Sequence, residues 1–90
     1  MKFIVTYSIK PEQRSEGTAR FLTTGAQPPH GVSMESRWHS ADMNRGFVLC
    51  ESNDAEALAK WSADWADLIV LEIVPVIDDE QAARVLGGGS

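Results

Sequence analysis

The clearest structural pattern in the chain covers residues 53–77, which read NDAEALAKWSADWADLIVLEIVPVI. Asn53 followed by Glu56 resembles a capping box, so it predicts the start of an alanine-rich helix. Bulky side chains then recur every three or four residues, which places on one helix face Leu58, Trp61, Trp65 and Leu68. From Leu68 to Ile77 the sequence is dense in β-branched residues and predicts a strand. This stretch therefore predicts a helix whose bulky face packs against a sheet.

Further elements are predicted on both sides of this stretch. Residues 1–9 alternate as a strand does, Lys10-Pro11 ends that strand, and a helix follows from Glu12 to about Thr24. The next elements are a loop over 25–31, a strand over 32–39, a turn over 41–46 and a strand over 47–51. Asp78 with Gln81 can cap a short terminal helix over 79–86. Residues 87–90, GGGS, are expected to form a flexible tail.

The order strand, helix, strand, strand, helix, strand is that of the split βαβ arrangement in ferredoxin-like folds. The turn over 41–46 is short, so the strands beside it form an antiparallel hairpin. Right-handed crossovers then place both main helices on one face of a four-stranded antiparallel sheet. We therefore expect an α+β fold with a single ferredoxin-like protomer over residues 1–86.

The composition argues against several classes of protein. Eight lysine and arginine residues against thirteen aspartate and glutamate residues give a net charge of −5 over 90 residues, so no nucleic-acid partner is expected. Residues 51–90 hold nine acidic side chains against two basic ones, and this half would repel an anionic membrane. The single cysteine, Cys50, allows no internal disulfide, and residues 1–8 are too short and polar for a signal peptide. We expect a cytoplasmic protein with no membrane partner.

The sheet face without helices is expected to be too apolar to stay in water. An antiparallel sheet with one solvated face should alternate apolar and polar residues. The strand over 68–77 instead has apolar residues on both faces, with Ile69, Leu71 and Ile73 on one and Val70, Val74 and Val76 on the other. A second copy of the same sheet, packed through a two-fold contact, would cover this face. We therefore expect a homodimer, and the alternative is a monomer with a solvated sheet.

The segment Arg37-Trp38-His39 is the strongest candidate for chemistry. Side chains in a strand alternate between its two faces. One face is therefore expected to hold Val32, Met34, Ser36 and Trp38, and the other is expected to hold Ser33, Glu35, Arg37 and His39. A cation and an imidazole two residues apart can orient an anionic or enolic substrate and move a proton, so Arg37 and His39 are candidate catalytic residues. The alternative is that Arg37 pairs with a neighbouring glutamate while His39 lies exposed at the strand end.

Glu72 is the third catalytic candidate. It interrupts a face that holds Val70 and Val74, where an unpaired carboxylate would be costly. The sequence leaves two interpretations open: a base, or a structural partner of Arg37 across the strands or across a dimer.

Five residues are candidates for ligand contact. Tyr7 and Glu51 lie at strand ends, and Trp38 lies between the two catalytic candidates. Trp61 and Trp65 are one helical turn apart, so they can form an aromatic wall for a planar ligand. Each has a structural alternative, because large aromatic residues are more often part of a core.

Motifs for cofactors and metals are absent from the sequence. No CxxC, HExxH, P-loop or GxGxxG motif occurs. A zinc site would require His30, His39, Cys50 and a carboxylate to converge from separate elements, and no spacing supports it. We predict no metal and no cofactor, and we expect Cys50 to be a small buried residue.

Several segments together resemble the DUF3303 family. They are MKFIVTYSIKPE at residues 1–12, Gly31 followed by Arg37-Trp38-His39, Gly46-Phe47-Val48-Leu49 with Glu51, the pair Trp61 and Trp65, and Ile73-Val74-Pro75-Val76 followed by acidic residues. The resemblance covers nearly the whole chain. It implies a place in the dimeric α/β-barrel superfamily, in which two ferredoxin-like sheets form one barrel. Relatives there include cofactor-independent monooxygenases, lactone isomerases, polyketide cyclases and haem-degrading enzymes, but a shared fold transfers none of these activities.

Three functional hypotheses remain open at this point. In the first, the protein encloses a small aromatic or anionic ligand, either between the helices and the sheet or in the barrel. The ligand would lie in a cavity of about 300 Å3 or more. The residues near it would be Tyr7, Arg37, His39 and Glu72. Its chemistry would be cofactor-independent proton transfer or of a monooxygenase type. The second is a non-catalytic structural or accessory homodimer with a filled interface, and the third is a haem- or flavin-associated protein. We favour the first, because packing alone explains poorly why charged and imidazole groups lie on an apolar sheet face.

Overall fold

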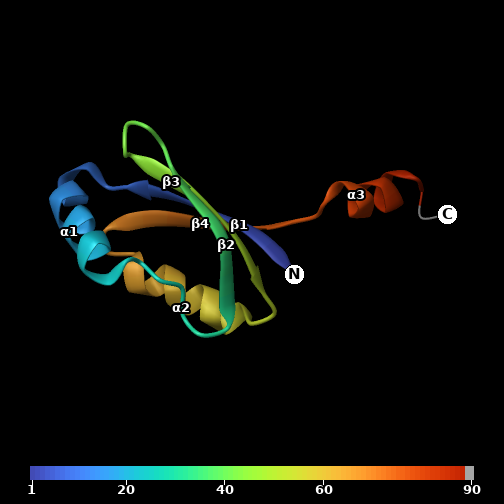
Figure 1. The fold of residues 1–90 in the computed structure, drawn as a ribbon, viewed down its shortest axis with the longest axis horizontal. Helices are drawn as coiled ribbons and strands as arrows, with labels where there is room; N and C mark the ends of the chain where they lie inside the picture. The colour runs from blue at the N-terminus through green and yellow to red at the C-terminus, as the bar shows by residue number, and fades with distance from the viewer. Residues whose placement is uncertain (89–90) are drawn as a thin grey trace.

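The computed structural model describes residues 1–88 as a four-stranded sheet with two helices against it and a third helix beyond its end (Figure 1). The elements are, in order, β1 (Lys2–Ile9), η1 (Pro11–Gln13), α1 (Arg14–Thr24), β2 (Val32–His39), β3 (Arg45–Ser52), α2 (Ala55–Trp65), β4 (Ile69–Val76) and α3 (Asp79–Leu86). The strand order is β2-β3-β1-β4, and every neighbouring pair is antiparallel. The predicted ferredoxin-like α+β fold is confirmed. Of the predicted tail over 87–90, residues 89 and 90 lie outside the described residues.

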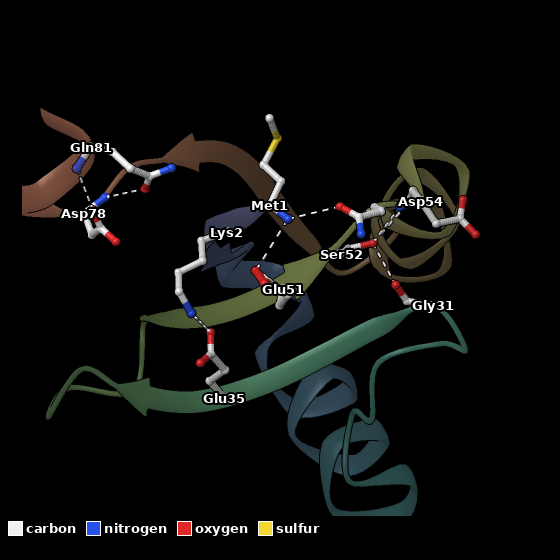
Figure 2. Close-up of polar contacts among 10 residues, drawn as sticks. Met1, Lys2, Gly31, Glu35, Glu51, Ser52, Asp54, Asp78 and Gln81 are labelled. Atoms are coloured by element: carbon white, nitrogen blue, oxygen red, sulfur yellow. Dashed lines mark hydrogen bonds and ion pairs between the residues drawn. The ribbon is translucent and has the colours of Figure 1, made fainter. Parts of the chain in front are cut away.

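Helix α2 begins one residue later than the sequence predicts. Asp54 is its N-cap, and the Asp54 carboxylate accepts a hydrogen bond from a first-turn backbone N–H at 3.0 Å. The prediction that Asn53 caps this helix is wrong, because Asn53 instead accepts a hydrogen bond from the amino group of Met1 at 3.1 Å. The Ser52 hydroxyl donates to the Gly31 carbonyl at 2.7 Å and accepts from the Asp54 N–H (Figure 2). These bonds tie the start of α2 to the start of β2.

The core lies between α2 and the sheet. Leu58 and Trp61 of α2 are buried and belong to one cluster with Val5, Val32, Val48, Cys50 and Ala57. Leu68, just before β4, is buried as well. Burying a leucine or valine side chain contributes roughly 1.5–3 kcal/mol, so this cluster fixes α2 on the sheet. The predicted bulky face of α2 is confirmed in this core.

Helix α1 packs more loosely than α2. Its only buried residue is Gly17, which has no side chain to fill the space beneath the helix. Phe21 is half-buried, and Leu22 is 76% exposed. Because α1 directs so little volume at the sheet, the space between them is incompletely filled.

A β-bulge in β2 changes which residues of this strand share a face. Met34 lies opposite Cys50 and Ser36 lies opposite Leu49, so Glu35 is an extra residue in the ladder. Strict alternation is therefore wrong for this strand, because one extra residue moves every following side chain to the other face.

The bulge directs two candidate residues toward the helices. Arg37 lies opposite Val48, which is buried under the helices, and His39 lies opposite Gly46 on the same face. Trp38 consequently lies on the open face of the sheet, where it is 68% exposed. The prediction that Met34 and Arg37 lie on opposite faces is wrong.

The open face carries apolar side chains together with an ion pair. Its exposed apolar residues come from three strands and are Trp38, Phe47, Val70 and Val74. Lys2 and Glu35 form an ion pair at 2.6 Å beside them (Figure 2). Within the described residues, no helix is long and apolar enough to cross a membrane.

Helix α3 is capped as predicted and lies apart from the rest of the protein. Asp78 accepts from the Gln81 N–H at 2.8 Å, and the Gln81 side chain accepts from the Asp78 N–H at 3.0 Å (Figure 2). None of its residues is buried. Figure 1 shows α3 beyond the end of the sheet, on the side away from α1.

Candidate functional site

A pocket of about 210 Å3 lies where α1 leaves the sheet incompletely covered. Its walls are mainly apolar and include Val5, Ile9, Phe21, Leu22, Val48, Trp61, Trp65, Ile69 and Leu71. The polar groups on its wall are Tyr7, Thr18, Arg37 and His39. At about 30 Å3 per water molecule, the volume equals roughly seven waters. The pocket is thus smaller than the roughly 300 Å3 expected, and its volume suits a small molecule.

Tyr7 and His39 form a hydrogen-bonded pair on the pocket wall. The Tyr7 hydroxyl and the His39 Nδ1 are hydrogen-bonded, although the residues lie 32 positions apart. Tyr7 is on β1, His39 is at the end of β2, and β3 lies between these strands. Their rings meet nearly edge to face, with centroids 6.1 Å apart. Within residues 1–88, His39 Nε2 has no hydrogen-bond partner, so this nitrogen is available to a ligand.

Gly46 on β3 makes this pair possible. It is buried and lies directly opposite both Tyr7 on β1 and His39 on β2. A Cβ atom on Gly46 would overlap the Tyr7 ring. The Tyr7 ring therefore crosses over the backbone of β3, which allows its hydroxyl to meet the imidazole of the next strand.

The surroundings of Tyr7 keep its hydroxyl protonated. Burial raises the pKa of the phenol, and the nearby charge of Arg37 offsets part of this effect. At neutral pH the hydroxyl therefore carries its proton and can donate it to His39 Nδ1 or to a ligand.

Phe21 of α1 connects the imidazole and the guanidinium. The Phe21 ring meets His39 edge to face, with centroids 5.4 Å apart, and the Arg37 guanidinium lies over the same ring at 5.0 Å. Contacts of these kinds are worth roughly 0.5–1.5 kcal/mol each. Phe21 thus limits the movement of both side chains.

Arg37 is also held by the backbone that follows α1. Its Nη1 donates to the Ala26 carbonyl at 2.8 Å and its Nη2 donates to the Gly25 carbonyl at 2.9 Å. Gly25 ends α1 in the left-handed conformation, at φ 71°, and Ala26 follows at φ 46°. The positive charge therefore lies at the negative end of the helix dipole, which is a favourable position. Two of the five guanidinium N–H groups are used for structure.

Trp65 and Trp61 close the pocket on the side of α2. Trp61 is buried in the core, whereas Trp65 is half-buried and has the Arg20 guanidinium over its ring at 5.3 Å. Arg20 also forms two hydrogen bonds with the Asp67 carboxylate, at 3.0 and 2.8 Å, and these lower the pKa of Asp67. The arginine thus fixes α1 beside the end of α2.

The mouth of the pocket is formed by exposed apolar residues. Leu22 of α1 is 76% exposed, and Met43 of the β2–β3 turn is 54% exposed. Met43 has a φ of 62°, which is uncommon for a residue other than glycine or asparagine. A ligand that fills the pocket would contact both side chains.

The structure brings together five of the eight predicted site residues. Those on the pocket wall are Tyr7, Arg37, His39, Trp61 and Trp65. The other three, Trp38, Glu51 and Glu72, lie on the open face of the sheet.

Arg37 and Glu72 cannot form the predicted pair across the strands of one protomer. Glu72 is exposed and lies opposite Thr6, whereas Arg37 faces the helices on the other side of the sheet. Glu51 instead lies 3.5 Å from the amino group of Met1 (Figure 2).

Sequence reasoning missed Phe21, Gly46 and Met43 as parts of the site. Phe21 contacts a strand residue 18 positions away, which no local pattern in the sequence indicates. Gly46 follows a turn and was interpreted as turn chemistry. The pairing of β1 with β3 places this glycine opposite Tyr7, and a glycine at such a position indicates that the tyrosine ring can cross over the strand.

Neither a cluster of metal-ligating residues nor a reactive cysteine accompanies the pocket in the part of the chain that the structure describes. Within residues 1–88, no three His, Cys, Asp or Glu residues lie close enough to hold a metal ion. Cys50 is fully buried, as expected, and burial raises the pKa of its thiol. A protonated, enclosed thiol is a poor nucleophile.

These features define the class of protein: a ferredoxin-like α+β domain with a small pocket between its helices and sheet. The chain belongs to the family described as "Domain of unknown function (DUF3303)", whose model matches residues 1–90. No curated protein and no solved structure matches the chain.

Proposed function

We propose that the pocket binds a small, planar, mostly apolar molecule with one hydroxyl or carbonyl oxygen, and that Tyr7 and His39 exchange a proton with this oxygen. The main support for the proposal is the Tyr7–His39 hydrogen bond. With Arg37, these two residues form the polar corner of a pocket whose walls are mainly apolar. Pockets of this kind bind by apolar contact and orient the ligand with a few polar groups.

The pair can bind a carbonyl oxygen or take a proton from a hydroxyl. When Tyr7 donates to Nδ1, the neutral imidazole carries its proton on Nε2 and can donate a hydrogen bond to a ligand carbonyl oxygen. In the other tautomer, Nδ1–H donates to the phenol oxygen and Nε2 accepts a proton from a ligand hydroxyl. That step breaks the ligand O–H bond and leaves an enolate or phenolate beside an imidazolium. Tyr7 fixes the ring orientation in both cases.

Arg37 is partly engaged in structural contacts, so it offers a permanent anion fewer free donors than an unbound guanidinium would. Two of its N–H groups already donate to Gly25 and Ala26, and its face rests on Phe21. The guanidinium still contributes a positive field, which stabilises an enolate or phenolate when it forms. Within the described part of the chain, no carboxylate lines the pocket to oppose this charge.

We also propose that the protein is a cytoplasmic homodimer joined through the open face of its sheet. The exposed Trp38 and Val70 support this contact, because large apolar side chains on a sheet are usually covered. Such a dimer would form the barrel that the family resemblance implies. It would also bury Glu72, so a cross-dimer pair for this carboxylate belongs to the same proposal.

The binding proposal is tested with 2-naphthol and 2-naphthoate as probes, followed by quenching of tryptophan fluorescence. We expect 2-naphthol to bind the native protein, and to bind roughly two- to tenfold more weakly to Tyr7→Phe and His39→Ala. A hydrogen bond typically contributes about 0.5–1.5 kcal/mol, which corresponds to this range. His30→Ala is the matched control, because His30 is exposed and lies outside the pocket. Oxygen uptake with bound 2-naphthol would identify monooxygenase-type chemistry.

Equal binding of 2-naphthol to His39→Ala, Tyr7→Phe and the native protein would overturn the proposal. Stronger binding of 2-naphthoate than of 2-naphthol would contradict the proposed hydroxyl or carbonyl ligand. If neither probe binds and the protein forms a stable dimer, the results would instead support the non-catalytic structural homodimer.

A further inference from the structure

Helix α3 lacks the contacts that a helix of its length needs. It has eight residues, none of them buried, and helices shorter than about 12 residues are marginal in water. Its capping box and the Glu80–Arg84 ion pair each add only a small stabilisation. The helix must therefore obtain most of its stability from a surface outside its own sequence.

One face of α3 is suited to such a surface. Ala82, Val85 and Leu86 follow the spacing of a single apolar stripe, whereas the ion pair of Glu80 and Arg84 lies on the opposite side of the helix. Val85 is 69% exposed and Leu86 is 85% exposed. Ile77, in the link before the helix, is also exposed.

The place where α3 leaves the sheet points to a second copy of the chain. The helix follows β4, an edge strand, and continues past the end of the sheet, away from α1 and α2 (Figure 1). The open face of β4, with Val70 and Val74, faces the copy that would cover the sheet. An arm that extends beyond its own sheet in this way is placed to reach the surface of a second protomer packed on the open face.

The size of the open face supports the same conclusion. Four strands about 4.8 Å apart, with eight residues rising about 3.3 Å each, give a footprint of about 500 Å2 per protomer. Stable interfaces usually bury about 800 Å2 per partner. Accessible surface exceeds the flat footprint beneath it, so the sheet face is close to the usual size, and the apolar stripe of α3 would add to the contact.

We propose that α3 of each protomer packs its Ala82–Val85–Leu86 stripe on the second protomer, as an exchanged arm. This inference rests on the proposed homodimer. The two-fold relation gives each arm one receptor and leaves no unpaired arm, so the assembly closes as a dimer.

The test is isotope-filtered NMR on a dimer formed from equal amounts of 13C-labelled and unlabelled full-length chain. We expect Overhauser contacts from the methyl groups of Val85 and Leu86 to protons of the other chain. If these methyl groups contact only protons of their own chain, or residues 79–86 show random-coil shifts in a dimeric protein, the exchanged arm is wrong and the homodimer stands. A protein that remains monomeric overturns both proposals.

Variants provide an independent measurement by sedimentation. We expect Val85→Asp combined with Leu86→Asp to weaken dimerisation at least tenfold. Arg84→Asp changes the net charge by the same amount on the opposite side of the helix, so it controls for charge and should change the dimer constant less than threefold. Equal effects of the two variants would contradict a specific role for the apolar stripe. The pocket proposed to bind 2-naphthol is formed by residues of one chain. Loss of naphthol binding would therefore overturn the binding proposal without affecting the test of the exchanged arm.

Discussion

Gly46 lies directly opposite Tyr7 in the β1–β3 ladder, and the phenol ring occupies the space that a side chain at position 46 would fill. This contact allows Tyr7 to reach across β3 to His39. The polar corner of the pocket thus depends on a residue that itself has no functional group.

Gly46→Ala should be strongly unfavourable, because its methyl group would overlap the Tyr7 ring. We expect a loss of about 1–3 kcal/mol in the free energy of unfolding, as for other overpacked sites. In a Tyr7→Ala background the same substitution should cost much less, because the ring is gone. Chemical denaturation of the four proteins in this cycle measures the coupling, and additive costs would contradict the contact.

Gly17→Ala should have the opposite sign. A Cβ atom on Gly17 would lie 4.0 Å from Ile9 Cγ2, which is an ordinary contact, and alanine favours the helix by about 1 kcal/mol. We expect a higher melting temperature and a slightly smaller pocket, measured by calorimetry and by naphthol affinity. A destabilised Gly17→Ala protein would show that α1 packs more tightly on the sheet than the structure indicates.

Tyr7 should titrate at unusually high pH. It is the only tyrosine in the chain, so the ultraviolet absorbance of tyrosinate reports on it alone. Burial raises its pKa, so the native protein should ionise above the usual value near 10 and the denatured chain near 10. The resulting stabilisation is complete below pH ~10 and is lost as the pH rises through the folded-state pKa. Arg37→Gln should raise the midpoint further, and a midpoint at or below 10 in the native protein would contradict this effect of partial burial.

Arg37→Gln should loosen the end of α1, because the carbonyl groups of Gly25 and Ala26 lose their charged donor. We expect a cost of about 1–3 kcal/mol in the free energy of unfolding. Amide hydrogen exchange should become faster in the last turn of α1. Arg45→Gln, at an exposed position, is the control and should change stability by less than about 0.5 kcal/mol. Equal stability of the two variants would mean that Arg37 does not anchor the helix.

Cys50 should resist thiol reagents until the protein unfolds. Its side chain is fully buried, and burial raises the pKa of the thiol. We expect the rate of modification to follow the unfolded fraction across a denaturant series. Rapid modification of the native protein would show that the core around Val5 and Val48 opens locally.

The order of elements could be predicted from the sequence because local patterns determine it. The stripe of Leu58 and Trp61, the capping pair of Asp78 and Gln81, and the turn before β3 all depend on residues a few positions apart. Local periodicity and capping are strong enough here to fix each helix and strand.

The faces of β2 could not be predicted in the same way. Its bulge at Glu35 arises from pairing with β3 and with the Lys2 side chain of β1, which are distant in sequence. The prediction that Arg37 and His39 share a face survived, because both lie after the bulge. The N-cap at Asp54 was missed because Asn53 binds the amino group of Met1, another contact that only the folded chain creates.

The most direct test of the proposed function is a crystal structure of the protein soaked with 2-naphthol. The account predicts that the rings lie between Phe21 and Trp65, with the hydroxyl within hydrogen-bond distance of His39 Nε2 or of the Tyr7 hydroxyl. A probe bound only at the open face beside Trp38, or a pocket that stays free of the probe at saturating concentration, would contradict it.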